Sequence, residues 1–286
     1  MKRSSGDKRD IYYRLAKQEG WRARSAYKLL HIDKQFNIFK GVKHALDLCA
    51  APGSWSQVLL RQLRSDSNVD PSEIKVVAVD LQVIAPLPGL IQIVGDITKV
   101  ETAKAVIEQF KGEHCELVVC DGAPDVTGLH DIDEFVQGQL LLAAINITTY
   151  VLSPGGTFVA KIFRGKDVTY LLSQLHLLFR YVTITKPRSS RSTSIESFVI
   201  CQKYQPLEGY KPTMFNPLLI NINDECVFTG TNKFISPYLA CGNMQGLDRN
   251  DTTKLKLSNP EQSEGSSGFF RLEEYGKASQ EDKRSL

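Results

Sequence analysis

Short apolar runs alternate with stretches of helical spacing along the first two thirds of the chain. The runs that predict strands are His44–Leu48, Lys75–Asp80, Ile91–Val94, Leu117–Cys120, Thr157–Phe163, Val182–Lys186 and Ser197–Gln202. Helical spacing predicts helices over Arg24–Phe36, Trp55–Arg64, Thr102–Phe110, Asp133–Val151 and Asp167–Phe179. Apolar strands separated by helices indicate a parallel sheet that is covered on both faces. The short polar connection PRSSRSTSIES favours an antiparallel closing strand, so we expect a doubly wound α/β domain with seven strands.

The alternation ends near Tyr204. Prolines at positions 206, 212 and 217 then interrupt any helix, and Ile235–Cys241 is the one short apolar segment. From about Lys254 onward Ser, Glu, Gln, Gly and Lys dominate, a composition typical of disordered chain. We therefore expect a domain over residues 1–204, an ordered appendage over 205–253 and a disordered tail over 254–286.

Composition excludes several classes of protein. With 286 residues, of which 42% are hydrophobic, the chain is neither a disulfide miniprotein, nor collagen-like, nor wholly disordered. The opening MKRSSGDKRD is too polar for a secretory signal, and polar residues interrupt the longest apolar stretch, Leu140–Leu152. The six cysteines are unevenly spaced and form no C-x-x-C motif, which indicates reduced thiols. We expect a soluble intracellular protein with no membrane span.

Positive charge is concentrated at the N-terminus. The net charge is +3, yet residues 1–28 contain nine Lys or Arg and three Asp or Glu, so this segment carries +6 and the remaining 258 residues carry −3. Four aromatic residues, Tyr12, Tyr13, Trp21 and Tyr27, lie in the same segment. Such a segment suits a polyanion with stackable bases, although a solvated amphipathic helix explains the charge equally well. A second basic cluster at Lys186–Arg191 adds potential for binding phosphate.

Small residues follow the first predicted strand. In the run from Asp47 to Gln57, Ala50, Ala51 and Gly53 would let a ligand approach the backbone, and the helix that begins there could receive a carboxylate. The G-x-G-x-x-G fingerprint of a dinucleotide site is absent, which disfavours an NAD-dependent oxidoreductase. A ligand with a carboxylate and no pyrophosphate fits better.

Acidic residues stand at the ends of four successive strands, namely Asp47, Asp80, Asp96 and Asp121. Each alone could be a helix cap or a turn residue. Together they predict a nucleoside-bearing cofactor, with Asp80 accepting from the ribose hydroxyls and Asp96 accepting from an adenine amino group.

Lys161 lies within the otherwise apolar strand Thr157–Phe163, where an ammonium is costly to bury unless it is paired or its pKa falls. It could extend its ammonium out of the strand end to water, or it could be a general base. Glu196 similarly enters an apolar strand, and Lys28 could be an ordinary solvated lysine. In one cleft, a second ammonium would lower the pKa of Lys161 and the carboxylates would orient both lysines. The histidines show no metal-ligand spacing and no Ser-His-Asp arrangement is evident, so we expect no metal.

These motifs resemble the FtsJ/RrmJ family of S-adenosylmethionine-dependent RNA ribose 2'-O-methyltransferases. The resemblance covers about residues 7–204 and rests on DKRDIYYRLAKQEGWRARSAYKLL, LDLCAAPGSWSQ, VVAVDLQ, GDIT, DGAPDVTG, FVAKIF and SIESF. It implies a Rossmann-like class I methyltransferase fold with a seven-stranded, mostly parallel sheet and helices on both faces. The opening and the CDGAPDVTGLHD run are most similar to the eukaryotic cytoplasmic tRNA branch, which methylates anticodon-loop nucleotides 32 and 34.

The resemblance also implies roles for particular residues. Lys28, Asp121, Lys161 and Glu196 match the family's catalytic tetrad, with Lys161 as the base that takes the ribose 2'-hydroxyl proton. The implied contacts to S-adenosylmethionine are Gly53 and Trp55 near the methionine, Asp80 at the ribose, Asp96 at the adenine, and Asp121. No metal is required by this scheme.

The tRNA branch further implies separate partners that select the nucleotide, one an armadillo/HEAT-type helical-repeat protein and the other a WD40-propeller protein. The unmatched residues 205–253 are the candidate docking surface, and the expected location is cytoplasmic. Two alternatives stay open, a ribosomal or cap RNA 2'-O-methyltransferase with the same core and a non-catalytic RNA-binding module. The complete tetrad and the lack of a large added RNA-binding domain argue against them.

Overall fold

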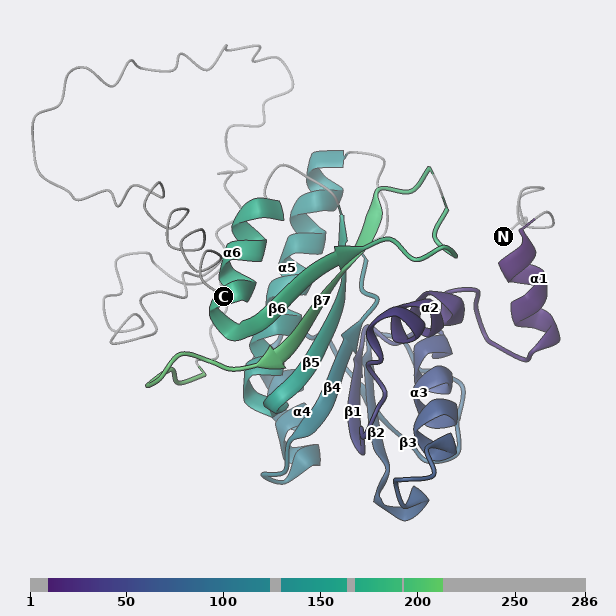
Figure 1. Ribbon diagram of the computed structural model, residues 1–286, viewed down its shortest axis with the longest axis horizontal. Helices are drawn as coiled ribbons and strands as arrows, with labels where there is room; N and C mark the ends of the chain where they lie inside the picture. The colour runs from purple at the N-terminus through teal and green to yellow at the C-terminus, as the bar shows by residue number, and fades with distance from the viewer. Residues whose placement is uncertain (1–9, 124–129, 164–167, 192, 213–286) are drawn as a thin grey trace, which may run out of the picture. The chain divides into compact units, whose positions relative to one another are not determined.

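A seven-stranded sheet carries the fold, with its strands in the order β3-β2-β1-β4-β5-β7-β6 (Figure 1). The computed structural model describes residues 10–123, 130–163, 168–191 and 193–212. The strands are β1 (His44–Leu48), β2 (Lys75–Asp80), β3 (Leu90–Val94), β4 (Cys115–Cys120), β5 (Leu152–Phe163), β6 (Phe179–Thr185) and β7 (Glu196–Tyr204). The helices are α1 (Ile11–Gln18), α2 (Ala26–Phe36), α3 (Ser54–Ser65), α4 (Val100–Phe110), α5 (His130–Val151) and α6 (Val168–Leu178), with a 3-10 turn at Pro71–Glu73.

The strand directions confirm the predicted topology. Strands β3, β2, β1, β4 and β5 pair in parallel, as their helical connections require. β7 lies between β5 and β6 and pairs antiparallel with both, so the short polar connection does close the sheet as expected. The chain therefore has the Rossmann-like, doubly wound architecture that was predicted.

Most element boundaries differ by a few residues from the sequence prediction, most of all at the start of β5. β5 begins at Leu152 instead of Thr157, because its first residue pairs with Cys115 before the register shifts at an irregularity. β6 begins at Phe179, directly after α6, with no loop between them. Helix α1 was not given bounds from the sequence; its first turn is fixed by the side chain of Asp10, which accepts from the N–H groups of Tyr12 and Tyr13 at 3.0 and 3.3 Å.

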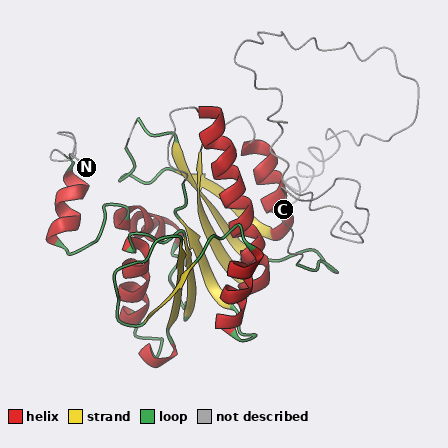
Figure 2. Ribbon diagram, turned by 180° about the vertical axis from the view of Figure 1, so that it is seen from behind, coloured by secondary structure: helices red, strands yellow, loops and turns green. Residues whose placement is uncertain are grey.

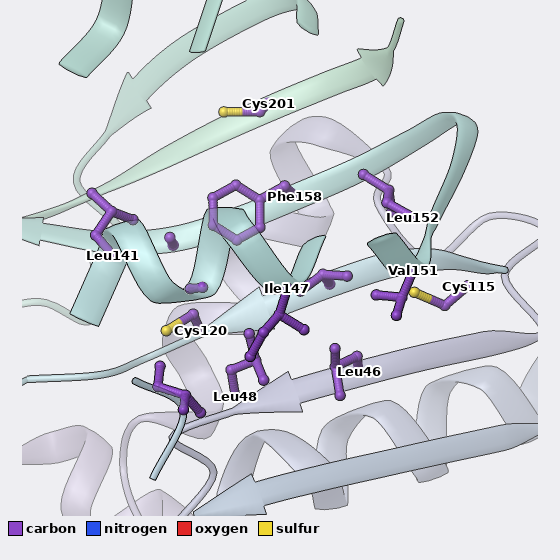
Figure 3. Packing of buried hydrophobic residues seen from close by; sticks show 14 of the residues in the cluster. Leu46, Leu48, Cys115, Cys120, Leu141, Ile147, Val151, Leu152, Phe158 and Cys201 are labelled. Atoms are coloured by element: carbon purple, nitrogen blue, oxygen red, sulfur yellow. The ribbon is translucent and has the colours of Figure 1, made fainter. Parts of the chain in front are cut away.

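Helices cover both faces of the sheet (Figure 2). Alternate residues of each strand point to opposite faces, so Leu46 and Leu48 of β1 pack with α4, α5 and α6, whereas Ala45 packs with α1, α2 and α3. On the first face, Ile147 and Val151 of α5 lie over the strands among the buried side chains that Figure 3 shows. The two apolar layers hold the strand ends in place, and those ends carry the site.

The described chain continues onto the domain beyond Tyr204. The N–H of Gln205 bonds to the carbonyl of Leu178, Tyr210 packs against the core, and the hydroxyl of Tyr150 donates to the carbonyl of Pro212 at 3.1 Å. The chain separates into two compact units, residues 1–241 and residues 242–286. The rest of the predicted appendage, residues 213–253, and the predicted tail, 254–286, lie outside the described residues.

Among the described residues, no helix is both long enough and apolar enough to cross a membrane.

The packing of Tyr210 predicts that Tyr210→Ala lowers the free energy of unfolding by about 1–3 kcal/mol, since a half-buried aromatic ring is lost. Chemical denaturation of the full chain measures this change. Gln205→Ala is the matched control, because the side chain of Gln205 is exposed. Equal stabilities of the two variants would contradict the packing described here.

Candidate active site

Lys161 and Asp121 meet at the ends of neighbouring parallel strands. The last matched pair of the β4–β5 ladder is Cys120 and Ala160, so Asp121 leaves β4 beside Lys161, while β5 continues to Phe163. The Lys161 Nζ lies 2.7 Å from Asp121 Oδ1 and donates to the backbone carbonyl of Asp121 at 2.8 Å. The side chains are 10% and 17% exposed, so this is a largely buried ion pair.

A second ion pair lies beside the first. The Lys28 Nζ of α2 lies 2.9 Å from Oε2 of Glu196, the first residue of β7. The same Nζ is 5.7 Å from the ring centre of Phe198, and Phe198 pairs with Lys161 in the β5–β7 ladder. The structure thus brings all four predicted tetrad residues to one place.

The pKa values of Lys161 and Glu196 are shifted in opposite directions. Burial acts to lower the pKa of Lys161, but the charge of Asp121, with a smaller contribution from Glu196, outweighs it, so the pKa is raised. Burial acts to raise the pKa of Glu196, but Lys28 and then Lys161 outweigh it, so the pKa is lowered. The expectation that a second ammonium lowers the pKa of Lys161 is therefore wrong. Lys28 is paired with Glu196, and the negative charges of Asp121 and Glu196 dominate the surroundings of Lys161.

The acid that ends β1 is enclosed. Asp47 is fully buried, its Oδ2 accepts from the hydroxyl of Ser56 at 2.6 Å, and its Oδ1 has no hydrogen-bond partner. Burial raises the pKa of Asp47 to about 7, and the charges of Asp121 and Asp80 add to the rise while the bond from Ser56 opposes it. Asp47 therefore keeps one buried oxygen, Oδ1, with unused acceptor capacity.

The loop after β1 is drawn toward the end of β2. Asp80 accepts from the N–H of Ala51 through Oδ2 and from the N–H of Gln82 through Oδ1, both at 2.8 Å. Each oxygen keeps acceptor capacity after one such bond. Asp96, which follows β3, accepts from the N–H and the hydroxyl of Thr98 through its Oδ1. Asp47, Asp80, Asp96 and Asp121 therefore line one edge of the sheet, as predicted.

Gly53 is required by its position as well as by its backbone angle. Its φ is +94°, and a Cβ there would lie 2.5 Å from Arg22 Nη1 and 2.6 Å from Ile84 Cγ2. Arg22 itself donates to the carbonyl of Pro52 at 3.1 Å and to that of Ala85 at 2.6 Å, tying the segment before α2 to the loop. Sequence reasoning missed Arg22, which lies within the basic segment and looked like one of many phosphate ligands.

The side chain of Trp55 faces away from the predicted cofactor. It is 2% exposed, its Nε1 donates to the carbonyl of Ser25 at 2.8 Å, and its ring packs on Phe198. Only the backbone N–H of Trp55, in the first turn of α3 where N–H groups have no intrahelical acceptor, is available to a ligand carboxylate. The predicted contact through Trp55 is thus confined to its backbone.

Packing uses most of the aromatic residues in the basic segment. Trp21 and Tyr27 are 7% and 8% exposed, and Tyr12 packs at 5.4 Å from the ring of Tyr27. The interpretation of these rings as base-stacking groups is therefore wrong for Trp21 and Tyr27. The basic residues Arg14 and Lys17 are exposed on α1, whereas residues 1–9 lie outside the described chain.

The second basic cluster lies against the N-terminal segment. Arg24 bonds to the carboxylate of Asp10 and to the carbonyl of Ser189, and His31 Nδ1 is 3.2 Å from the Ser189 hydroxyl. Burial, followed by the charge of Arg188, lowers the pKa of His31. Arg188 and Arg191 are exposed on the loop that leads to Glu196, so positive charge flanks the two ion pairs.

This arrangement can move a proton and hold an acidic or nucleoside ligand beside it. Lys161 is a largely buried amine in contact with Asp121, and Asp47, Asp80 and Asp96 follow along the strand ends from β1 to β3. In the described part of the chain, no group of three or more His, Cys, Asp or Glu side chains is placed to hold a metal ion.

Comparisons with known proteins agree with this geometry. The family model for FtsJ-like methyltransferases matches residues 21–204. The chain is 57% identical over 259 residues to the tRNA (cytidine(32)/guanosine(34)-2'-O)-methyltransferase of Mus musculus, covering 90% of this chain and 78% of that protein. It is 52% identical over 264 residues to the protein of the same name from Schizosaccharomyces pombe, covering 90% of each. A Plasmodium falciparum crystal structure assigned as a ribosomal RNA methyltransferase superposes with a TM-score of 0.57 and 26% identity, over 64% of this chain and 98% of that one.

The Lys28–Glu196 pair predicts a coupled loss of stability. We expect Lys28→Met and Glu196→Gln each to lower the free energy of unfolding by about 2–3 kcal/mol, because each leaves a mostly buried charge alone. The double variant should lose less than the sum of the two single losses. Denaturation of the four proteins measures the coupling, and strict additivity would contradict the pairing.

The lowered pKa of Glu196 sets how this effect depends on pH. A carboxyl whose pKa is lower in the folded than in the unfolded chain stabilises the fold at pH values above its pKa in the unfolded chain. This contribution is lost as the pH falls through its pKa in the folded chain. The stability difference between the wild type and Glu196→Gln should therefore be constant near neutral pH and shrink in acid, below about pH 4.

Proposed function

The chain belongs to the FtsJ-like methyltransferase family, and from that premise we propose that it methylates a ribose 2'-hydroxyl of tRNA with S-adenosylmethionine as the donor. The proposed targets are nucleotides 32 and 34 of the anticodon loop, one or both, as in the names of the mouse and fission yeast relatives. The observation that carries the proposal is the enclosed Lys161–Asp121 pair, beside Lys28–Glu196, at the edge where the cofactor acids gather.

The residues fit the proposed cofactor. The N–H groups in the first turn of α3 suit the methionine carboxylate, and the free Oδ1 of Asp47 is an unused acceptor beneath the same loop. Asp80 has acceptor capacity for two ribose hydroxyls, and Asp96 lies at the end of the adjoining strand for the adenine amino group. When bound, S-adenosylmethionine supplies a methyl group that the positive charge on sulfur has already activated.

Because the methyl group arrives activated, the chain's own work is to position the ribose and to take one proton. Lys161 accepts the proton of the 2'-hydroxyl at Nζ, and it must first be in its neutral form to do so. Asp121 keeps the Nζ at the strand end, and the Lys28–Glu196 pair borders the space on the β7 side. When the bound RNA and cofactor exclude water from the site, the two ion pairs and the contact between Lys161 and the 2'-hydroxyl become stronger.

Basic residues on two elements would hold the RNA. Arg14 and Lys17 on α1 and Arg188 and Arg191 on the β6–β7 loop are exposed, and exposed basic side chains suit phosphates. A loop nucleotide is a suitable target because its ribose is accessible outside a regular duplex.

The helical-repeat and WD40-propeller partners stay predictions from the family resemblance, as does the cytoplasmic location. Of their candidate docking stretch, residues 205–253, the part after Pro212 lies outside the described residues. The ribosomal RNA alternative has weaker support, because the Plasmodium protein is 26% identical to this chain whereas the mouse tRNA enzyme is 57% identical.

The proposal predicts methyl transfer from labelled S-adenosylmethionine to an unmodified tRNA transcript at an anticodon-loop 2'-oxygen. Lys161→Ala should abolish methyl transfer but should still bind the cofactor, as measured by the rise in melting temperature when S-adenosylmethionine is added. Lys161→Arg should be equally inactive, because a guanidinium does not give up its proton near neutral pH. Transfer to ribosomal or capped RNA alone would keep the chemistry and overturn the tRNA assignment, and bound cofactor with no RNA methylated would favour the non-catalytic alternative.

The raised pKa of Lys161 predicts a strongly pH-dependent rate. The neutral amine is a small fraction at pH 7 and grows about tenfold per pH unit, so the single-turnover rate should rise with near-unit slope from pH 7 to about pH 9. Saturating cofactor and RNA at each pH separate this effect from binding. A flat profile over that range would show that Lys161 does not remove the proton.

A further inference from the structure

We infer that Gln137 is a positioning residue that fixes the backbone of Lys161 for proton transfer; this inference rests on the proposed function. Gln137 lies on α5 and is 5% exposed. Its Nε2 donates to the carbonyl of Lys161 at 2.6 Å, and its Oε1 accepts from the N–H of Phe163 at 3.4 Å. One side-chain amide therefore bonds to backbone groups on both sides of Ile162.

The geometry of the sheet explains why a side chain is needed there. In a parallel ladder, one residue donates its N–H to the carbonyl before its partner and accepts from the N–H after that partner. If the β4–β5 register continued beyond Cys120 and Ala160, Gly122 would be opposite Ile162 and would bond to Lys161 and Phe163. The amide of Gln137 makes the two bonds that a continued β4 would make.

Ending β4 at Cys120 is what allows Asp121 to turn toward Lys161. Gly122 packs closely at this turn, since a Cβ there would lie 2.9 Å from Cys49 Sγ and 3.3 Å from Cys120 Sγ. The turn would otherwise leave a buried carbonyl and a buried N–H of β5 without partners, which folded chains avoid. Because of Gln137, Asp121 can turn out of the sheet while the backbone of β5 at Lys161 stays fixed by hydrogen bonds.

Loosening this strand end would affect the lysine directly. Asp121 makes the direct contacts to the Lys161 Nζ, through its carboxylate and its carbonyl, so the direction of the Nζ depends on where the backbone of β5 lies. A misplacement of about 1 Å at a reacting group can lower a rate by as much as about a hundredfold. Among the described residues, the side chain of Gln137 bonds to the backbone of β5 and to none of the cofactor acids, so its loss should act on the rate and not on cofactor binding.

The test compares Gln137→Leu with the wild type in tRNA methylation by the full chain. We expect kcat to fall about tenfold or more, with the dissociation constant of S-adenosylmethionine changed less than about twofold. Thr148→Val is the matched control, because Thr148 is also buried on α5 and donates only to its own helix, to the carbonyl of Ala144. An unchanged kcat in Gln137→Leu, or equal losses in both variants, would overturn the inference.

Gln137→Glu distinguishes positioning from a general packing role. A protonated carboxyl donates and accepts like the amide, whereas a carboxylate can only accept. Because burial favours the protonated form, its activity relative to the wild type should be highest at low pH and fall as the pH rises. A ratio that does not change with pH would count against the hydrogen bond to Lys161.

Hydrogen exchange keeps the inference separate from the proposed function. If the wild type methylates no tRNA, the proposed function fails alone, and exchange of a peptide that contains residues 161–163 then decides. Faster exchange of that peptide in Gln137→Leu, with peptides from β7 unchanged, would support the anchoring. Exchange at the wild-type rate would refute it.

Discussion

An ammonium group buried at the end of β5 is the constraint on which the site depends. Lys161 needs a carboxylate within contact distance, because an isolated buried charge is strongly destabilising. That carboxylate belongs to Asp121, so β4 must end at Cys120 and let the chain turn. This turn leaves a carbonyl and an N–H of β5 without a β4 partner, and Gln137 bonds to both. A single charge requirement thus links a strand end, a glycine turn and a helix side chain.

The same sheet edge explains how cofactor and substrate could meet. Parallel strands end on one side, so Asp47, Asp80, Asp96 and Asp121 gather there without any long-range folding device. The N-terminal segment is joined to that edge by Arg22, which bonds across the loop after β1, and by Arg24, which bonds to the loop before Glu196. Both arginines belong to the segment that leads into α2, the helix that supplies Lys28 of the second ion pair.

Periodicity predicted the sheet and its order of elements, and charges in apolar strands singled out Lys161 and Glu196, because both are local signals. The full tetrad with Lys28 and Asp121 was implied by the family resemblance. The sequence could not predict which side a side chain faces once neighbours compete for it. Trp55 and Tyr27 looked like ligand contacts and are core residues, because α2, α3 and β7 meet over them. The direction of the Lys161 pKa shift depended on which carboxylate each lysine would meet. Gln137 carried only a weak signal, because α5 also contains the amides Gln139 and Asn146 and the role of Gln137 depends on where β4 ends.

A crystal structure of the full chain with S-adenosylhomocysteine and an anticodon stem-loop tests the central claim most directly. The account predicts that the 2'-oxygen of nucleotide 32 or 34 lies about 3 Å from the Lys161 Nζ, with the amide of Gln137 still on the carbonyl of Lys161. A target 2'-oxygen directed at another group, with Lys161 closed onto Asp121 and out of reach, would contradict it.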